Sequence, residues 1–120
     1  MSIPSHCPLL QPVADRLAEA MAKLTLRSPS IPYLSNRTAR VLDDEEDIRR
    51  DLATEVAHPV RWYDILEVLQ ELGAKLFVEM IPGHVSTHLV RELLTDVTAV
   101  SIADQGLNYA KVVAARIASP

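Results

Sequence analysis

The chain has 120 residues, 48% of them hydrophobic, with a net charge of −4 and a pI near 5.5. This length allows one small domain, and the apolar fraction excludes a disordered chain. The acidic balance disfavours a nucleic-acid binder, and no apolar run approaches the ~20 residues that cross a bilayer. One cysteine excludes an internal disulfide, and the missing signal-peptide pattern predicts a cytoplasmic protein.

The first half of the chain predicts a helix, a strand and a second helix. Apolar residues recur at helical spacing over residues 12–24, and the proline at the start suits the first helical turn. Residues 31–35 form a short apolar run whose proline cannot donate to a ladder, which predicts a strand that lies at an edge or begins at the proline. The acidic run at 43–46 opens the second helix, and the His-Pro pair at 58–59 ends it.

The second half alternates in the same way. A third helix is predicted over residues 62–72, a buried strand over 75–80, a fourth helix over 85–93, a strand over 98–102 and a last helix over 107–118. Because a helix separates each predicted strand from the next, the strands should be parallel. We therefore expect an α/β fold with a three-strand parallel sheet, no internal domain boundary and further sheet elsewhere, since parallel sheets are normally covered on both faces.

His6 is the first candidate functional residue. It lies between Pro4 and Pro8, directly before the first predicted helix. A histidine held rigidly at the mouth of a helix can serve as a general base. Taken alone, the same pattern also fits a surface histidine that caps the helix.

Four segments, in order, add a second line of argument. They are residues 3–7 (Ile-Pro-Ser-His-Cys), 33–36 (Tyr-Leu-Ser-Asn), 58–62 (His-Pro-Val-Arg-Trp) and 77–83 (Phe-Val-Glu-Met-Ile-Pro-Gly). Together they resemble the stretches around the catalytic histidine, a short strand ending in Asn, an Asn-Pro-Val-Gln-Trp motif and a Gly-Pro-Gly turn of malonyl-CoA:acyl-carrier-protein transacylases. Residues 36–40 and the 58–62 run look most similar to the malonyl transferase (epsilon) subunit of bacterial malonate decarboxylase.

The resemblance implies that residues 1–120 are the C-terminal portion of one acyltransferase domain, in its α/β-hydrolase-like subdomain. In the family the nucleophile is a serine in a Gly-x-Ser-x-Gly elbow, and these 120 residues contain no such motif. The elbow, the arginine that grips the malonyl carboxylate and the ferredoxin-like subdomain would precede this segment. The chain alone is therefore expected to be inactive. Its expected partners are malonyl-CoA, an acyl carrier protein and the missing N-terminal part of the same domain, with no nucleic acid or membrane.

The resemblance also implies roles for three residues. His6 would be the general base and acid, and the backbone carbonyl of Arg61 would orient it in place of the carboxylate of a triad. Arg61 stands where the family has glutamine, which puts a side-chain role in doubt but leaves a backbone contact possible. Ser5 belongs to the three residues before the histidine that help set acyl preference in related polyketide-synthase domains. We expect no metal and no cofactor besides the coenzyme A thioester substrate.

Other patterns leave different chemistry open. His84, His88 and Glu92 recur every four residues, so on a helix they would share a face that could bind a metal, although the HExxH pattern is absent. Cys7 adjoins the candidate histidine and could form a dyad, or be a small buried thiol. The Pro-Gly pair at 82–83 could present N–H groups to a phosphate or form a tight turn. For the whole chain, the alternative function is a non-catalytic module that binds a partner subunit or self-associates.

Overall fold

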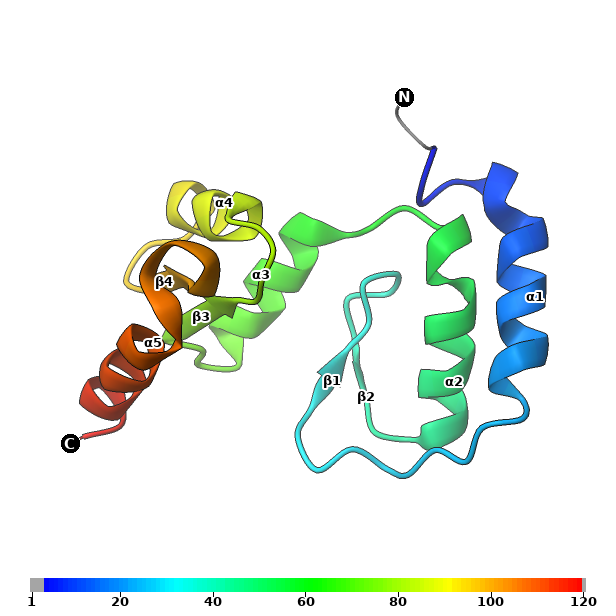
Figure 1. Ribbon diagram of the computed structural model, residues 1–120, viewed down its shortest axis with the longest axis horizontal. Coiled ribbons are helices and arrows are strands. Elements are labelled where there is room, and N and C mark those ends of the chain that lie inside the picture. The colour runs from blue at the N-terminus through cyan, green and yellow to red at the C-terminus, as the bar shows by residue number, and fades with distance from the viewer. Residues whose placement is uncertain (1–3, 120) are drawn as a thin grey trace. The chain divides into compact units, whose positions relative to one another are not determined.

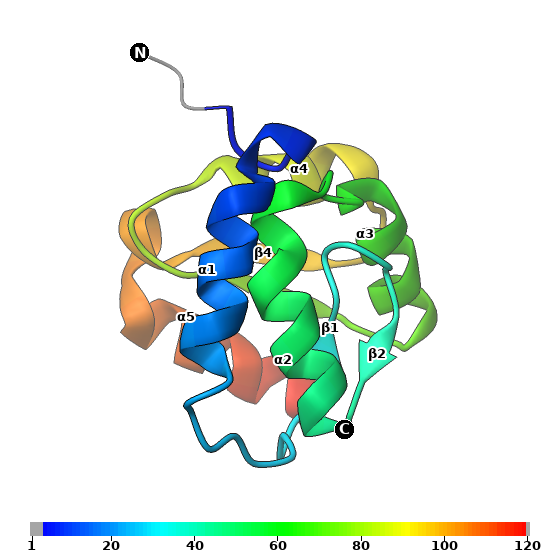
Figure 2. The same ribbon diagram turned by 90° about the vertical axis from the view of Figure 1, so that its right-hand side faces the viewer.

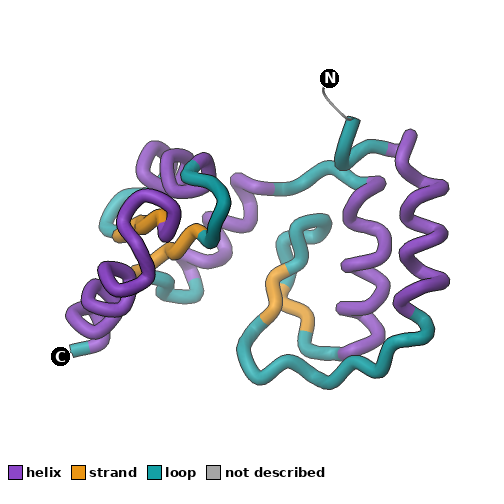
Figure 3. The backbone as a smooth tube through the Cα atoms, in the orientation of Figure 1, coloured by secondary structure: helices purple, strands orange, loops and turns teal. Residues whose placement is uncertain are grey.

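The computed structural model describes residues 4–119 and falls into two compact units. One unit ends at Ile65 and the other begins at Leu66; Figure 1 and the tube in Figure 3 draw both. The division lies inside a helix, where no proline, glycine or polar linker marks it in the sequence. Within the described part of the chain, no helix has both the length and the apolar character that crossing a membrane requires.

The first unit is built on two helices that lie side by side. The 3-10 turn η1 (Pro8–Leu10) leads into α1 (Gln11–Met21), while α2 (Glu45–Thr54) continues into the 3-10 turn η2 (Glu55–Ala57). Figures 1 and 2 both show α1 running along α2. The two helices thus bring the start of the chain close to the end of α2.

Helix α2 begins where the acidic run predicts it. The carboxylate of Asp44 accepts hydrogen bonds from the backbone N–H groups of Glu46 and Asp47, at 2.9 and 3.1 Å. These N–H groups have no partner within the helix, so the cap satisfies them. The acidic first turn also suits the positive end of the helix dipole.

Burial in the first unit departs from the apolar stripe predicted for α1. Val13 and Leu17 of that stripe are 42% and 38% exposed, whereas Ala14 is buried. On α2, the buried apolar residues are Ile48 and Ala53. The periodicity of residues 12–24 therefore predicts a helix correctly but not the face that this unit buries.

A small antiparallel hairpin completes the first unit. β1 (Tyr33–Leu34) pairs with β2 (Val41–Leu42). The backbone N–H of Ser35 donates to the carbonyl of Arg40 at 2.9 Å and closes the turn, in which Ala39 has a φ of +54°. The predicted three-strand parallel sheet is not confirmed, because the first strand reverses directly through this turn instead of crossing over through a helix.

The second unit contains the parallel pairing that the sequence predicts. β3 (Leu76–Glu79) and β4 (Thr98–Ser101) pair in parallel, with α4 (Val85–Leu93) as the crossover between them. Both α4 and α5 (Ile102–Ala118) pack on these strands. Helix α5 starts before residue 107 and bends at Gly106, whose φ of +81° is not helical. Ile102, which the sequence predicts as the end of the strand, is the first residue of this helix.

Helix α3 (Trp62–Glu71) ends where the glycine predicts it. Gly73 has a φ of +85° and its N–H donates to the carbonyl of Gln70 at 2.9 Å, while the N–H of Ala74 donates to Leu69 at 3.0 Å. This is the Schellman pattern, in which a left-handed glycine lets the chain turn back onto the last helical carbonyls. The turn then leads into β3.

Candidate active site around His6

The ring of His6 contacts a backbone carbonyl at the end of α2. Its Nδ1 lies 3.2 Å from the oxygen of Glu55, the first residue of η2. A carbonyl oxygen only accepts hydrogen bonds, so this contact requires the proton to be on Nδ1. The lone pair of the neutral ring is then on Nε2, which is free to accept a proton.

The backbone of His6 adopts an uncommon conformation. Its φ is +56°, in the left-handed region that residues with a Cβ rarely occupy. Such a conformation costs on the order of 1–3 kcal/mol and persists only where the surroundings hold it, which is common at functional sites. The cost favours a functional origin for this residue over a simple cap.

The predicted contact between His6 and the carbonyl of Arg61 is not among the hydrogen bonds of residues 4–119. The Arg61 carbonyl accepts from the N–H of Ile65 at 3.0 Å, in the first turn of α3. The carbonyl that faces His6 Nδ1 belongs to Glu55 instead. The backbone carbonyl that contacts His6 thus comes from a residue that the resemblance does not indicate, and the orienting role of Arg61 stays a prediction.

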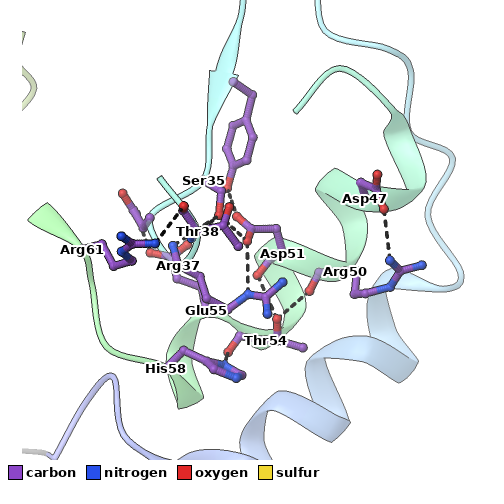
Figure 4. Close-up of polar contacts among 12 residues, drawn as sticks. Ser35, Arg37, Thr38, Asp47, Arg50, Asp51, Thr54, Glu55, His58 and Arg61 are labelled. Carbon is purple, nitrogen blue, oxygen red and sulfur yellow. Dashed lines mark hydrogen bonds and ion pairs between the residues drawn. The ribbon is translucent and has the colours of Figure 1, made fainter. Parts of the chain in front are cut away.

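Arg61 is attached to the turn that follows β1. Its backbone N–H donates to the carbonyl of Asn36 at 2.8 Å, and its Nη1 donates to the carbonyl of Thr38 at 3.2 Å, as Figure 4 shows for the labelled side chains. Its Nε lies 2.6 Å from the Asp64 carboxylate, and the Arg61 side chain is 52% exposed. The guanidinium therefore already has two partners.

The same turn is also attached to the end of α2. The side-chain amide of Asn36 donates to Oε1 of Glu55 at 2.6 Å. Glu55 is the residue whose carbonyl faces His6. A chain of two contacts therefore leads from the hairpin turn to the imidazole.

A buried carboxylate holds the base of the hairpin. Asp51 is 1% exposed and accepts from the hydroxyls of Ser35, at 2.6 Å, and Tyr33, at 2.9 Å (Figure 4). Nε of Arg37 lies 3.5 Å from the same carboxylate. Burial, with help from the hydrogen bond to the neighbouring Asp51 carboxylate and from its charge, raises the pKa of Tyr33, so the hydroxyl remains a donor.

The residues beside His6 form no further constellation. Ser5 is exposed, and Cys7 is partly buried, with its thiol 3.5 Å from the carbonyl of Pro4. The thiol has a backbone partner and no hydrogen bond to the neighbouring imidazole among the described residues. Ile3, the first residue of the 3–7 motif, lies outside the described part of the chain.

The possible metal face lies on the surface of α4. Nε2 of His88 is 3.3 Å from the Glu92 carboxylate, while Nδ1 of His84 is 3.6 Å from Asp104, and both histidine side chains are about 70% exposed. The two histidines therefore face different carboxylates. Residues 4–119 contain no group of three or more His, Cys, Asp or Glu side chains placed to hold a metal ion.

The N–H groups suggested as a phosphate cradle after residues 82–83 already have a carboxylate partner. Glu79 accepts from the N–H groups of Ser86 and Thr87 at 3.1 and 2.6 Å. Burial acts to raise the pKa of Glu79, but these hydrogen bonds to its charged form outweigh burial and lower it. The carboxylate is therefore the anion at the start of α4.

Comparison with known proteins finds acyltransferases that are similar to this chain in sequence and in fold. The malonyl-CoA:acyl-carrier-protein transacylase of Salmonella typhimurium is 34% identical over 99 residues, which are 82% of this chain and 32% of that protein. The crystal structure of the corresponding enzyme from Xanthomonas oryzae matches with a TM-score of 0.84 at 34% identity, over 96% of this chain and 36% of that one. No protein-family model matches the chain.

A third match is a malonyl transacylase solved in complex with the holo acyl-carrier protein of a type II polyketide synthase. It has a TM-score of 0.80 at 29% identity and covers 91% of this chain and 37% of that one. The chain thus belongs to the malonyl-CoA:acyl-carrier-protein transacylase-like acyltransferases, and it spans about a third of the length of the curated relatives it matches. The Salmonella and Xanthomonas relatives bear the transacylase name, so the malonate decarboxylase subunit stays a prediction.

Glu55 and Asp51 are the site residues that sequence reasoning missed. Both read as polar positions on an acidic helix, and no spacing distinguishes them from the exposed Glu45 or Glu46. Asn36 lies in the 33–36 segment that resembles the family. The resemblance therefore pointed to Asn36, but it did not indicate which residues Asn36 contacts. Only the fold brings Glu55 and Asp51 next to the hairpin turn that contains Asn36.

Proposed function

We propose that this chain supplies the catalytic histidine of a malonyl-type acyltransferase. His6 is the general base and acid, and the coenzyme A thioester of malonate and the thiol of an acyl carrier protein are the substrates. The observation that carries the proposal is the contact of Nδ1 with the Glu55 carbonyl, which leaves Nε2 free. The similarity to malonyl transacylases supports the substrate class, and the relative solved with its acyl-carrier protein supports the acceptor.

The proposed reaction has two balanced steps. In the first, Nε2 of His6 takes the proton of a serine hydroxyl from another segment of the domain, and the serine oxygen attacks the thioester carbon. The carbon–sulfur bond breaks, and the imidazolium gives its proton to the leaving coenzyme A thiolate. In the second step, Nε2 takes the proton of the carrier thiol, and the thiolate attacks the carbonyl carbon of the serine ester. The carbon–oxygen bond to serine breaks, and the imidazolium returns its proton to the serine oxygen.

Three further assignments belong to the proposal. A backbone carbonyl, from Glu55 or from Arg61, replaces the carboxylate of a triad by accepting the Nδ1 proton. Ser5, exposed beside the histidine, contributes to the choice of acyl group. The serine, the oxyanion donors and the residue that binds the malonyl carboxylate come from the missing N-terminal part of the same domain.

The test compares two histidines of the first unit in a complete acyltransferase that includes this chain. His6→Ala should lower malonyl transfer by roughly 10²–10⁴-fold, the usual contribution of a positioned general base. His58→Ala is the matched control, because His58 also contacts a backbone carbonyl, that of Thr54, at 2.8 Å. Transfer that survives His6→Ala at the wild-type rate, with folding intact, would overturn the proposal.

The 120-residue chain itself gives a second readout. Incubated with radiolabelled malonyl-CoA, it should form no malonyl ester, because its sequence contains no elbow serine. A stable, stoichiometric ester on a hydroxyl of this chain would contradict that expectation.

A non-catalytic interaction module remains the second candidate, and the exposed apolar residues of the first unit favour it. Leu9 is 78% exposed, Val13 42% and Leu17 38%. Leu9 lies in η1 and the other two residues lie in α1, and exposed apolar residues that are close together are typical of a surface that another protein covers. Light scattering at tens of micromolar should then show self-association, and a clean monomer would count against this candidate.

A further inference from the structure

We propose that Asn36 is a positioning residue for His6. The side chain of Asn36 donates to Glu55, whose backbone carbonyl faces the imidazole. The backbone carbonyl of Asn36 accepts from the N–H of Arg61, the residue whose carbonyl is expected by resemblance to orient His6. The inference rests on the proposed function only for the role of His6 as the base. Asn36 itself would touch neither substrate nor the reacting atoms.

The contact with Glu55 is the more direct of the two. Nδ2 of Asn36 lies 2.6 Å from Oε1 of Glu55, and a hydrogen bond to a charged acceptor is stronger than one between neutral groups. Glu55 follows the last residue of α2, where a helix end can fray. Holding the Glu55 side chain fixes the residue whose carbonyl accepts from His6 Nδ1.

The contact with Arg61 uses the backbone of Asn36. The carbonyl of Asn36 accepts from the N–H of Arg61 at 2.8 Å. One residue therefore connects the end of α2 with the segment that opens α3. A shift of Asn36 would therefore displace both the Glu55 carbonyl, which faces the imidazole, and the Arg61 carbonyl, which is expected to do so by resemblance.

The residues on either side of Asn36 are held by hydrogen bonds of one buried hydroxyl. The hydroxyl of Ser35, which is fully buried, donates to Asp51 and accepts from the N–H groups of Arg37 and Thr38 at 3.2 and 3.0 Å. The backbone on both sides of Asn36 is thus attached to a buried carboxylate. Asn36 is thus held in the hairpin turn, and its side chain can in turn hold Glu55 of η2 in place.

The experiment observes the tautomer of each histidine by nitrogen-15 NMR of the full 120-residue chain. In water the Nε2–H form of imidazole predominates, whereas the carbonyl of Glu55 requires the Nδ1–H form of His6. In the wild type we expect His6 in the Nδ1–H form. Asn36→Ala should move His6 toward the mixture seen in free histidine.

Two comparisons separate positioning from general loosening of the fold. His58 also contacts a carbonyl through Nδ1, so its signals should not change in Asn36→Ala. Arg40→Ala, at an exposed position of the same turn, should leave His6 in its wild-type form. If His6 is unchanged in Asn36→Ala, or His58 changes as much as His6, Asn36 is not a positioning residue.

A second pair of variants tests the same contact from the other partner. Glu55→Gln keeps an acceptor oxygen for the Asn36 amide and should preserve the His6 tautomer, whereas Glu55→Ala should lose it. This pair decides the question if Asn36→Ala does not fold. The readout is independent of malonyl transfer, so failure of the proposed enzyme activity and failure of this inference give different results. In an active parent enzyme, Asn36→Ala should lower kcat roughly 10- to 100-fold with little change in KM, as expected for a displaced base.

Discussion

The two units each use a carboxylate to fix a backbone segment, but they satisfy it in different ways. Asp51 of the first unit is almost fully buried and accepts from two side-chain hydroxyls. Glu79 of the second unit is closer to solvent and accepts from two backbone N–H groups at the start of α4. The Asp51 carboxylate is the buried acceptor of side-chain hydrogen bonds, whereas the Glu79 carboxylate caps a helix.

The difference follows from how much backbone pairing each unit has. The hairpin of the first unit contains only two residue pairs, too few to be stable alone, so buried side-chain hydrogen bonds must hold it against α2. The parallel strands of the second unit pair over four residues and are packed by helices. There the carboxylate only has to satisfy the free N–H groups of the crossover helix.

Removal of the buried carboxylate should have the largest effect. Asp51→Ala leaves the buried hydroxyl of Ser35 and the partly buried hydroxyl of Tyr33 without their acceptor, which should lower the free energy of unfolding by about 3 kcal/mol. The measurement is urea unfolding followed by circular dichroism. Asp47→Ala, on the same helix but 53% exposed, should change the free energy of unfolding by less than about 0.5 kcal/mol. Equal effects of the two variants would show that burial of the Asp51 carboxylate gives the first unit no special support.

Loss of the helix cap should have a smaller effect. Glu79→Ala leaves the N–H groups of Ser86 and Thr87 to water, and we expect a loss of about 1 kcal/mol, as for other N-terminal caps. Glu92→Ala on α4, where the side chain is 61% exposed, is the control and should have little effect. A loss as large as that of Asp51→Ala would show that Glu79 does more than cap the helix.

Acidification should reduce the contribution of Glu79 to the free energy of unfolding. The pKa of Glu79 is lowered in the folded chain from its ordinary value of 4.5, so the folded state favours the charged form. Its contribution to stability is present above pH 4.5 and is lost as the pH falls through the lower folded value. The stability difference between wild type and Glu79→Gln should therefore be larger at about pH 6 than at about pH 3. A difference that grows on acidification would contradict the direction of the shift.

The smallest effect is expected for a surface residue beside the candidate site. Arg61→Gln removes contacts with Thr38 and Asp64 that are mostly exposed, and it keeps the backbone N–H that donates to Asn36. Stability should change by less than about 0.5 kcal/mol, and malonyl transfer by a parent enzyme should be nearly unaffected. If this variant were as damaging as His6→Ala with folding intact, the guanidinium would act on the substrate, and orientation through a backbone carbonyl would not explain the site.

Much of the second unit could be predicted from the sequence, because its signals are local. Gly73 ends α3, and the alternation of strand, helix and strand predicts the parallel pairing of β3 with β4. The first unit is harder to predict. Val41 and Leu42 are too short a run to be recognised as a strand, so the sequence does not reveal the hairpin and suggests a third parallel strand instead.

By itself, the sequence determined the position of most helices, the two strands of the parallel pair and His6 as a candidate base, because helix caps, apolar periodicity and a histidine between prolines are properties of neighbouring residues. Only the tertiary structure decided which carbonyl faces the imidazole. Glu55 is 49 positions away from His6, and its contact depends on how α1 lies along α2 and on how the hairpin turn places Asn36. Contacts of this kind join residues that are distant along the chain and chemically ordinary in it, so no local pattern can specify them.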